Sequence, residues 1–243
     1  MTDVAERLTK VERDQSHPNL KPRDAATLIV VDRSGPTPKV LLGRRHAGLK
    51  FMAGKFVFPG GRMEPGDRKM PVASELDAHA GARLMRGVQR PSLSKARALA
   101  LAAIRETYEE TGLLLGKRVD EVPPVPEGPW QAFAEARVLP DLAALHFIVR
   151  AITPPRRPRR FDARFFAVDA SAIAHRVEGK VGPDSELVEL VWIPIKQART
   201  LDMPTITGTV LEELEARVKA GMAHELPVPF YFMENQQFFR DLL

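Results

Sequence analysis

The segment from Lys95 to Thr111 constrains the fold more than any other part of this 243-residue chain. It is rich in Ala and Leu, which are strong helix formers. Ser92 or Ser94 can cap its start, and Gly112 follows its end, where a residue with a left-handed backbone commonly stops a helix. The sequence therefore predicts one long helix in the middle of the chain.

Apolar segments with the length of strands lie on both sides of this helix. The Ser34-Gly35-Pro36 turn joins the first two and predicts a hairpin. Strands before and after a central helix favour a single α/β domain. The expected strands are 25–32, 39–44, 55–58, 145–152, 164–168 and 189–193, and further helices are expected at 73–86 and 211–220.

Composition limits the class of protein. The chain is 44% hydrophobic, which is enough for a core without staples, and the absence of Cys excludes disulfide frameworks, zinc-thiolate sites and cysteine nucleophiles. No leader peptide or membrane-spanning run is visible, so we expect a soluble, cytoplasmic protein. Residues 1–22 are expected to form an N-terminal arm on a domain over 23–243. The net charge of +5 allows an anionic partner without naming one.

Three glutamates share one face of the expected helix. Glu106, Glu109 and Glu110 fall within an arc of roughly 100°. Like charges at this spacing repel, and the C-terminal end of a helix disfavours negative charge. The face is either a solvated acidic surface or a site where a hard divalent cation offsets the repulsion. The opposite side of the helix is expected to carry Leu101, Ile104, Tyr108 and Leu115.

A glycine pair precedes this helix in the chain. Phe58-Pro59-Gly60-Gly61 lets the backbone approach a ligand closely at a strand end. Together the two segments resemble the Nudix hydrolase signature, Gly-x5-Glu-x7-Arg-Glu-U-x-Glu-Glu-x-Gly-U, in which U is apolar. Arg105, Glu106, Glu109, Glu110, Gly112 and Leu113 match its second half, with Thr107 at the first U position.

The chain departs from the signature in two ways. Asp67 stands where the first Glu is expected. Asp67 and Arg105 are also 38 positions apart, whereas the signature expects about 8. The box is therefore split by an insertion at about 68–97. That insertion is either a tolerated surface excursion, because lengthening a loop costs little, or a lid or dimerisation element.

The resemblance implies a Nudix-type α/β/α sandwich with a mixed sheet and a mainly helical inserted segment. It implies hydrolysis of a nucleoside diphosphate derivative with Mg²⁺ or Mn²⁺. By matching position, Glu109 and Glu110 would bind metal with the Gly60 carbonyl, Glu106 would be a ligand or the base, and Arg105 would orient Glu106. Later carboxylates that could be the base or an extra ligand are Glu178, Asp184, Glu186 and Glu189.

The segment ahead of the glycines bears on the substrate. Leu41-Leu42-Gly43-Arg44-Arg45, Gly54 and Phe58-Pro59 are similar to an extra signature of coenzyme A diphosphatases, with Lys50 where Arg is usual. Phe51-Met52 and the split box resemble the branch of these enzymes with a long insertion. This implies coenzyme A or acyl-coenzyme A as substrate, giving 3′,5′-ADP and 4′-phosphopantetheine or its acyl form. Expected substrate-binding residues are Arg44, Arg45, Lys50 and Gly61, with the basic 156–160 loop as a further candidate.

Other functions stay open at this point. A broader ADP-ribose, dinucleotide or nucleotide-sugar diphosphatase would use the same box. A non-catalytic Nudix-fold ligand sensor is disfavoured because all three helix carboxylates are present. Nucleic acid is not an expected partner, because no aromatic residues interleave the basic 156–160 loop. No membrane partner is expected, and a homodimer is an expectation of the family only.

Overall fold

A mixed β-sheet divides the protein, which is described here from a computed structural model covering residues 4–13 and 15–243. Residues 1–3 and 14 of the expected arm lie outside the described residues. The strands of the sheet follow the order β11-β2-β1-β9-β8-β12-β13, with β3 paired to β2 and β4 paired to β1. β1 runs parallel to β9 and β12 parallel to β8, while the other pairs are antiparallel.

The elements have the following bounds. The sheet contains β1 (Arg23–Asp32), β2 (Lys39–Arg45), β3 (Phe56–Val57), β4 (Gly60–Arg62), β8 (His146–Ile152), β9 (Phe161–Asp169), β11 (Leu187–Pro194), β12 (Pro229–Glu234) and β13 (Gln237–Leu242). Two smaller sheets pair β5 (Leu113–Leu115) with β10 (Ile173–Arg176) and β6 (Lys117–Arg118) with β7 (Val138–Leu139). The α-helices are α1 (Val4–Lys10), α2 (Ala78–Leu84), α3 (Leu93–Thr111), α4 (Gln131–Glu135), α5 (Ile195–Ala198) and α6 (Thr205–Lys219), with 3-10 turns η1 (Pro65–Arg68), η2 (Leu142–Ala144) and η3 (Ala170–Ala172).

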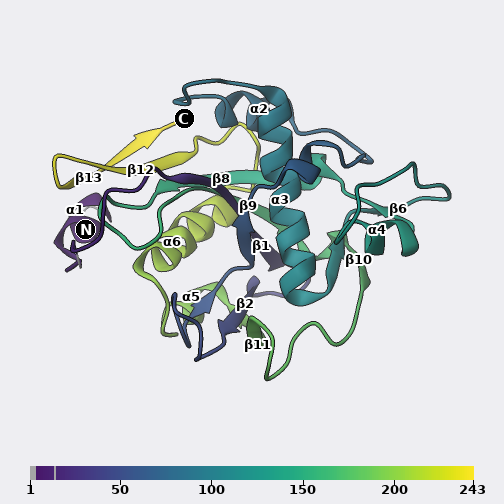
Figure 1. Ribbon diagram of the computed structural model, residues 1–243, viewed down its shortest axis with the longest axis horizontal. Helices are drawn as coiled ribbons and strands as arrows, with labels where there is room; N and C mark the ends of the chain where they lie inside the picture. Colours follow the sequence, from purple (N-terminus) through teal and green to yellow (C-terminus); the bar gives the residue numbers. More distant parts are fainter. Residues whose placement is uncertain (1–3, 14) are drawn as a thin grey trace.

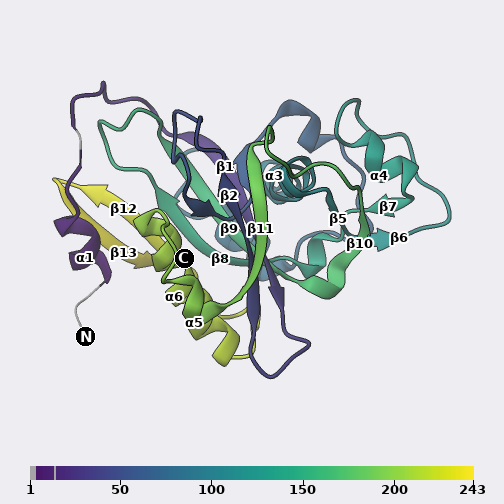
Figure 2. The ribbon, with the colours of Figure 1, turned by 90° about the horizontal axis from the view of Figure 1, so that it is seen from below.

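Helices cover both faces of the sheet. α3 lies on one face, and α5 and α6 lie on the other (Figures 1 and 2). β1 serves both sides, because Leu28 and Val30 belong to the core around α3 while Ile29 and Val31 belong to the core around α6. A strand buried on two faces reads as a continuous apolar run, as β1 does. The α/β/α sandwich expected from the sequence is confirmed.

The long helix and its two ends match the sequence prediction. The Ser92 side chain accepts a hydrogen bond from the Lys95 backbone N–H, and Gly112 has a left-handed backbone with φ of 77°. One expectation on this helix was wrong. Leu115 lies in β5 rather than on the apolar side of α3, because the helix has already ended at Thr111.

Two other helices differ in extent from the prediction. The helix expected over 73–86 is confined to α2, because the Asp77 side chain caps its start at the N–H groups of His79 and Ala80. The late helix begins at Thr205, directly after Pro204, rather than at 211. The hairpin of β1 and β2 is confirmed by the pairing of Asp32 with Lys39.

The segment between the two halves of the box packs onto the body of the protein. Met70, Ala80 and Leu84 are buried in the core around α3. The Arg83 guanidinium donates hydrogen bonds to the carbonyls of His224 and Glu225, which ties α2 to the loop after α6. α2 therefore lies beside the C-terminal part of the chain, as Figure 1 shows.

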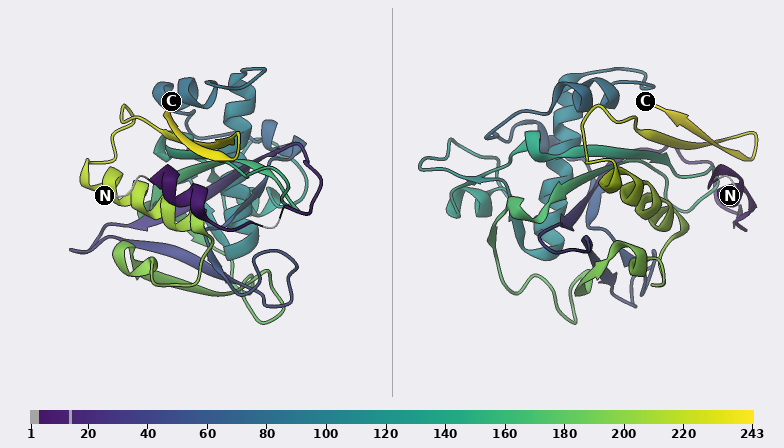
Figure 3. Two further views of the ribbon diagram at one scale, coloured as in Figure 1. Left: turned by 90° about the vertical axis from the view of Figure 1, so that its left-hand side faces the viewer. Right: turned by 180° about the vertical axis from the view of Figure 1, so that it is seen from behind.

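The first helix and the last hairpin of the described residues lie against each other at one side of the sheet. α1 lies against the β12–β13 hairpin (Figures 1 and 3). The Thr9 hydroxyl accepts a hydrogen bond of 2.9 Å from the Phe238 N–H, and Leu8 is buried in the core around α6. Within the described residues, no helix is long and apolar enough to cross a bilayer.

Candidate active site

Arg105 is the centre of the hydrogen-bond network on α3. Its guanidinium pairs with both carboxylate oxygens of Asp67 at 2.8 and 3.2 Å and donates to the Arg62 carbonyl at 2.8 Å. Its Nη1 donates to Glu106 at 3.0 Å and Glu109 at 2.6 Å. Burial lowers the pKa of Arg105, but hydrogen bonds and charge from Asp67 and the two glutamates outweigh burial and raise it. The residue expected to orient Glu106 does contact Glu106.

Asp67 connects the two halves of the box in space, because it pairs with Arg105 across the insertion. Its side chain is completely buried, and besides Arg105 it accepts a hydrogen bond of 2.7 Å from the Glu64 N–H. Glu64 and Asp67 form a capping box around η1, which fixes the turn after the glycines. The first half of the box is thereby held against α3, although Asp67 and Arg105 are 38 positions apart.

Glu106 and Glu110 are carboxylates in an environment that disfavours their charge. Burial raises the pKa of Glu106 to about 7, and Glu109 and Glu64 add to the rise while Arg105 opposes it. Burial also raises the pKa of Glu110 well above its ordinary value, with repulsion from Glu186 and Glu106. Glu109, by contrast, is exposed. Two of the three carboxylates on the acidic face are therefore largely enclosed by the protein, and only Glu109 faces solvent.

The glycine pair lies directly against these carboxylates. The Gly60 N–H donates to Glu110 at 3.3 Å. A side chain at Gly61 would place its Cβ within 2.4–2.5 Å of the Glu106 carboxylate, and one at Gly60 would meet the Ala26 carbonyl at 2.6 Å. Both positions therefore require glycine. At Gly60 the backbone lies close to β1, and at Gly61 it lies close to the Glu106 carboxylate.

A cavity of about 500 Å³ opens beside this cluster. Glu106, Glu110 and Gly61 line it, together with Glu64 and Glu186. Basic and aromatic side chains complete its rim and walls. These include Arg45, Arg62, Arg157, Arg159, Phe51 and Phe161. A concave site with convergent carboxylates of raised pKa is the usual form of an active site.

The predicted residues upstream of the glycines separate into two groups. Arg45 lines the cavity and donates to Glu186 at 2.7 Å. Arg44 forms an ion pair of 2.8 Å with Glu189, and Lys50 is exposed. Neither Arg44 nor Lys50 lines the cavity. Strand alternation explains the difference between Arg44 and Arg45, since adjacent residues of β2 face opposite sides, whereas Lys50 lies in the loop after β2.

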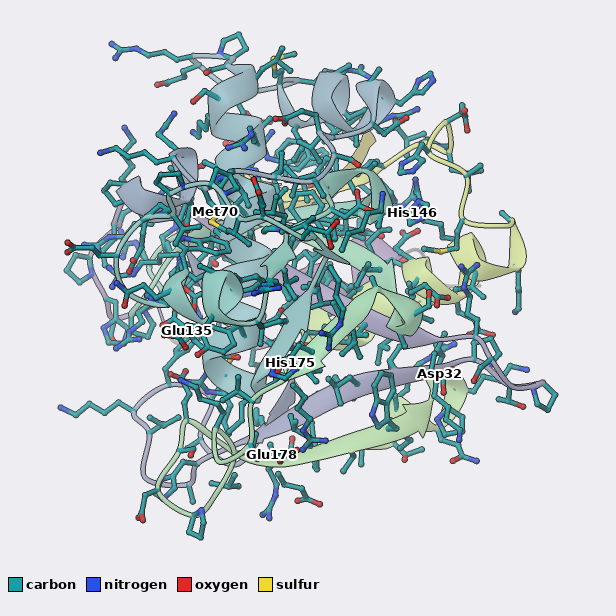
Figure 4. All side chains as sticks on the ribbon, turned by 90° about the vertical axis from the view of Figure 1, so that its right-hand side faces the viewer. Asp32, Met70, Glu135, His146, His175 and Glu178 are labelled. Atoms are coloured by element: carbon teal, nitrogen blue, oxygen red, sulfur yellow. The ribbon has the colours of Figure 1, made fainter. Side chains whose placement is uncertain are left out.

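The later carboxylates also separate. Glu186 lies just before β11, lines the cavity and contributes to the raised pKa of Glu110. Glu178 forms an ion pair of 3.2 Å with Arg176 and has an 80% exposed side chain. Figure 4 shows Glu178 at the lower edge of the molecule. The cavity is not lined by Glu178, Asp184 or Glu189.

The metal-ligand set expected from the resemblance does not converge in this structure. Among the residues that the structure describes, no group of three His, Cys, Asp or Glu side chains is placed to hold a metal ion. Glu106 and Glu109 turn to Arg105, and Glu110 turns to Gly60. The donors are nonetheless of the kind that Mg²⁺ or Mn²⁺ prefers, and two of them, the buried Glu110 and the largely buried Glu106, repel each other. Their chemistry fits a hard divalent cation.

Other residues of the cavity were not predicted from the sequence. Glu64 faces Glu106 closely enough to raise its pKa, and the arm contributes Leu8, Val11 and Arg13 to the cavity wall. Nothing in the local pattern of the arm points to a ligand. Its role follows only from its position against β13.

Comparison with known proteins agrees with this geometry. No family model matches the chain. A Nudix hydrolase from Alicyclobacillus acidocaldarius is 29% identical over 83% of this chain and 96% of its own, with a TM-score of 0.60. Two structures are less similar. The NUDIX domain of Shewanella oneidensis NrtR, complexed with ADP ribose, is 12% identical over 90% of this chain and 99% of its own, with a TM-score of 0.46. The M. smegmatis Nudix hydrolase RenU is 15% identical over 84% and 95%, with a TM-score of 0.44.

The sandwich fold, the glutamate helix placed against Gly60-Gly61 and the similarity to the Alicyclobacillus enzyme agree with one another. On these grounds the protein is a Nudix hydrolase.

Proposed function

We propose that this protein hydrolyses a diphosphate linkage in a nucleoside diphosphate derivative with a divalent metal ion, and that the substrate is coenzyme A or acyl-coenzyme A. The observation that carries the hydrolysis is the burial of Glu106 and Glu110 at one end of a cavity, with the pKa of both raised by burial and by neighbouring acids. Such a cluster is costly to a fold unless a cation or a proton neutralises it.

Glu106, Glu109, Glu110 and the Gly60 carbonyl are the groups that would hold Mg²⁺ or Mn²⁺. A bound ion would supply charge neutralisation at the non-bridging oxygens and a more acidic water. Arg105 positions Glu106 and Glu109, because its own guanidinium is held in place by Asp67. Glu106 then acts as a ligand or as the proton acceptor for the attacking water.

Glu186 is the further carboxylate that we assign to this site, as an extra ligand or as the base. It lines the same cavity as Glu110 and is held by Arg45, whose side chain is only 13% exposed. Glu178 takes second place for this role, since its partner is Arg176 and its side chain extends into solvent.

The substrate assignment rests on the upstream signature and on the basic rim. Arg45, Arg157 and Arg159 line the cavity and can pair with the phosphates of coenzyme A. The absence of a side chain at Gly61 lets the Glu106 carboxylate lie directly against this backbone, and a role of Gly61 in substrate binding stays a prediction. For Arg44 and Lys50, a role in substrate binding stays a prediction, as do the homodimer, the cytoplasmic compartment and the role of the 68–97 insertion.

The decisive experiment is a substrate panel with Mg²⁺ and with Mn²⁺, in which products are identified by mass. Coenzyme A should give 3′,5′-ADP and 4′-phosphopantetheine, and a chelator should abolish turnover. Efficient turnover of ADP-ribose or dinucleotides without turnover of coenzyme A would replace this proposal by the broader diphosphatase. Binding of nucleotides with no turnover of any compound would favour a ligand sensor.

Glu110→Gln tests the role of the buried carboxylate. We expect kcat to fall by roughly 10²-fold or more, because a neutral amide binds a hard divalent cation more weakly than a carboxylate does. The melting temperature should stay equal or rise, because the substitution removes a carboxylate that Glu106 and Glu186 repel. Glu189→Gln is the matched control, since Glu189 pairs with Arg44 outside the cavity. Wild-type activity in Glu110→Gln would remove Glu110 from the mechanism.

A further inference from the structure

Two aromatic rings line the cavity without contributing to either core. Phe51 lies in the loop after β2, and Phe161 is the first residue of β9. Both side chains are half-buried and line the cavity, and their ring centroids are 6.4 Å apart in an edge-to-face arrangement. Neither ring belongs to the core around α3 or to the core around α6. Core packing therefore does not explain these rings, whereas a ligand in the cavity can contact both.

Phe51 is connected to the carboxylate end of the cavity through Arg45. The Phe51 carbonyl accepts a hydrogen bond of 3.1 Å from Arg45 Nε. The same guanidinium donates from Nη1 to Glu186, and both of these residues line the cavity. One arginine therefore positions both the loop that carries Phe51 and the carboxylate that repels Glu110.

The register of the sheet separates Phe161 from the glycine pair. Phe161 pairs with Arg23 of β1, whereas Gly61 pairs with Ala26 on the other side of the same strand. The backbones of Phe161 and Gly61 are thus two strand spacings and three residues apart, about 14 Å along the sheet. A ligand that contacts both places must be extended, with one group at the carboxylates and another at the rings.

The surroundings of the two rings are polar. The Thr153 hydroxyl accepts a hydrogen bond of 3.0 Å from the Phe161 N–H, so within the described part of the chain its own proton is left for an acceptor on a ligand. The planar Arg159 guanidinium lies 5.7 Å from the Phe51 ring centroid. An aliphatic group here would leave such donors unpaired, which is costly. A nucleobase, by contrast, has a flat face that stacks on aromatic rings and hydrogen-bond acceptors at its edge.

We propose that Phe51 and Phe161 bind the nucleobase of the substrate by stacking, and that the Thr153 hydroxyl hydrogen-bonds the edge of this base. The inference rests on the proposed function and deepens it, because it fixes the direction in which a nucleoside diphosphate lies in the cavity. The diphosphate lies at the carboxylates and the base lies at the rings. Stacking provides affinity for any base, since every base has a flat face.

The test measures binding rather than turnover. Calorimetric titration with Mg²⁺ compares α,β-methylene-ADP with methylenediphosphonate, which share a hydrolysis-resistant diphosphate mimic and differ by the adenosine. The wild-type protein should bind the nucleotide roughly ten-fold more tightly or better. Phe51→Ala or Phe161→Ala should reduce this ratio of affinities by roughly five-fold or more, because a stack between base and ring is lost, and should leave the affinity for methylenediphosphonate unchanged. Phe51→Tyr keeps a flat ring and should retain the wild-type ratio.

Phe239→Ala is the matched control for these variants. Phe239 is 41% exposed and stacks on Phe232, but it does not line the cavity. Equal affinities of the wild type for the two compounds, binding of neither, or a ratio that Phe51→Ala and Phe161→Ala leave unchanged would overturn the nucleobase site. No step requires hydrolysis, so a ratio that falls in these variants supports the site even if coenzyme A is not a substrate. Melting curves show that each variant is folded.

Discussion

Asp67 and Arg105 form an ion pair whose side chains are 0% and 3% exposed. Removing one member of such a pair leaves the other charge buried without its partner, which typically costs 3–5 kcal/mol. We therefore expect Asp67→Asn to lower the free energy of unfolding by about 3 kcal/mol or more, measured by urea denaturation.

Asp202→Asn is the matched control for that measurement. It removes a carboxylate from a 2.6 Å pair with Lys55, but the Asp202 side chain is 74% exposed. Exposed pairs contribute about 0–1 kcal/mol, so the control should be close to wild type. Equal effects of the two substitutions would mean that Asp67 does not stabilise the fold through Arg105.

The residues of the site differ in how far the sequence could foresee them. Glu106, Glu109 and Glu110 lie on one helix, so their common face follows from helical geometry alone. The burial that raises the pKa of Glu106 and Glu110 depends on β4 and on Glu186, which come from distant parts of the chain. Local patterns carry no information about such contacts. The same reason explains why the arm's share of the cavity was not predicted.

Gly112, at the end of α3, must be glycine for two separable reasons. The φ of Gly112 is 77°, which is unfavourable for any residue with a Cβ, and a Cβ at this position would also lie 2.1 Å from the Val177 carbonyl oxygen. Gly128 has a comparable φ of 87° but open space around it. We expect Gly128→Ala to cost about 1 kcal/mol for the backbone alone, and Gly112→Ala to cost clearly more because the backbone of the 177–180 loop must move.

Thermal or urea unfolding of both variants checks this prediction. The difference between them measures the steric part, since the backbone part is shared. If Gly112→Ala and Gly128→Ala had the same stability, the contact with Val177 would not restrict the end of the helix. A larger loss in Gly112→Ala should be accompanied by lower activity, because Glu109 and Glu110 belong to the last turn of α3.

At the level of elements, prediction succeeded where several local signals agreed. For α3, composition, an N-terminal serine and a C-terminal glycine all indicate the same helix. β12 and β13 were not predicted, because their hairpin turns through Asn235 and Gln236 with no glycine or proline to mark it. Both residues have positive φ, at 47° and 65°. Asn in a two-residue turn between aromatic, alternating segments was the available signal.

At the scale of the whole molecule, the free energy of unfolding should decrease in acid because of His146. This side chain stacks on His224 with ring centroids 4.2 Å apart, and Arg217 and Arg33 add positive charge while Asp77 opposes them. Burial lowers the pKa of His146 to about 4. Figure 4 shows its position near the upper part of the molecule.

Because the folded pKa lies below the unfolded value near 6.5, only the unfolded chain takes up this proton in between. The stabilising contribution is complete above about pH 6.5 and is lost as pH falls toward 4, by at most about 1.4 kcal/mol per pH unit. His146→Gln should flatten this part of the stability curve, measured by urea unfolding between pH 7.5 and 4.5. Parallel curves for wild type and variant would exclude His146 as the source.

The hydrogen bond between Phe238 and Thr9 joins residues 229 positions apart. Contacts between such distant positions form late in folding, since the loop they close must first lose its entropy. The same contacts open early when the fold loosens, because β13 is the edge strand of the sheet. The far wall of the cavity would thus be assembled last and released first. Hydrogen exchange at the Phe238 amide would then report on access to the cavity while β1 and β9 remain protected.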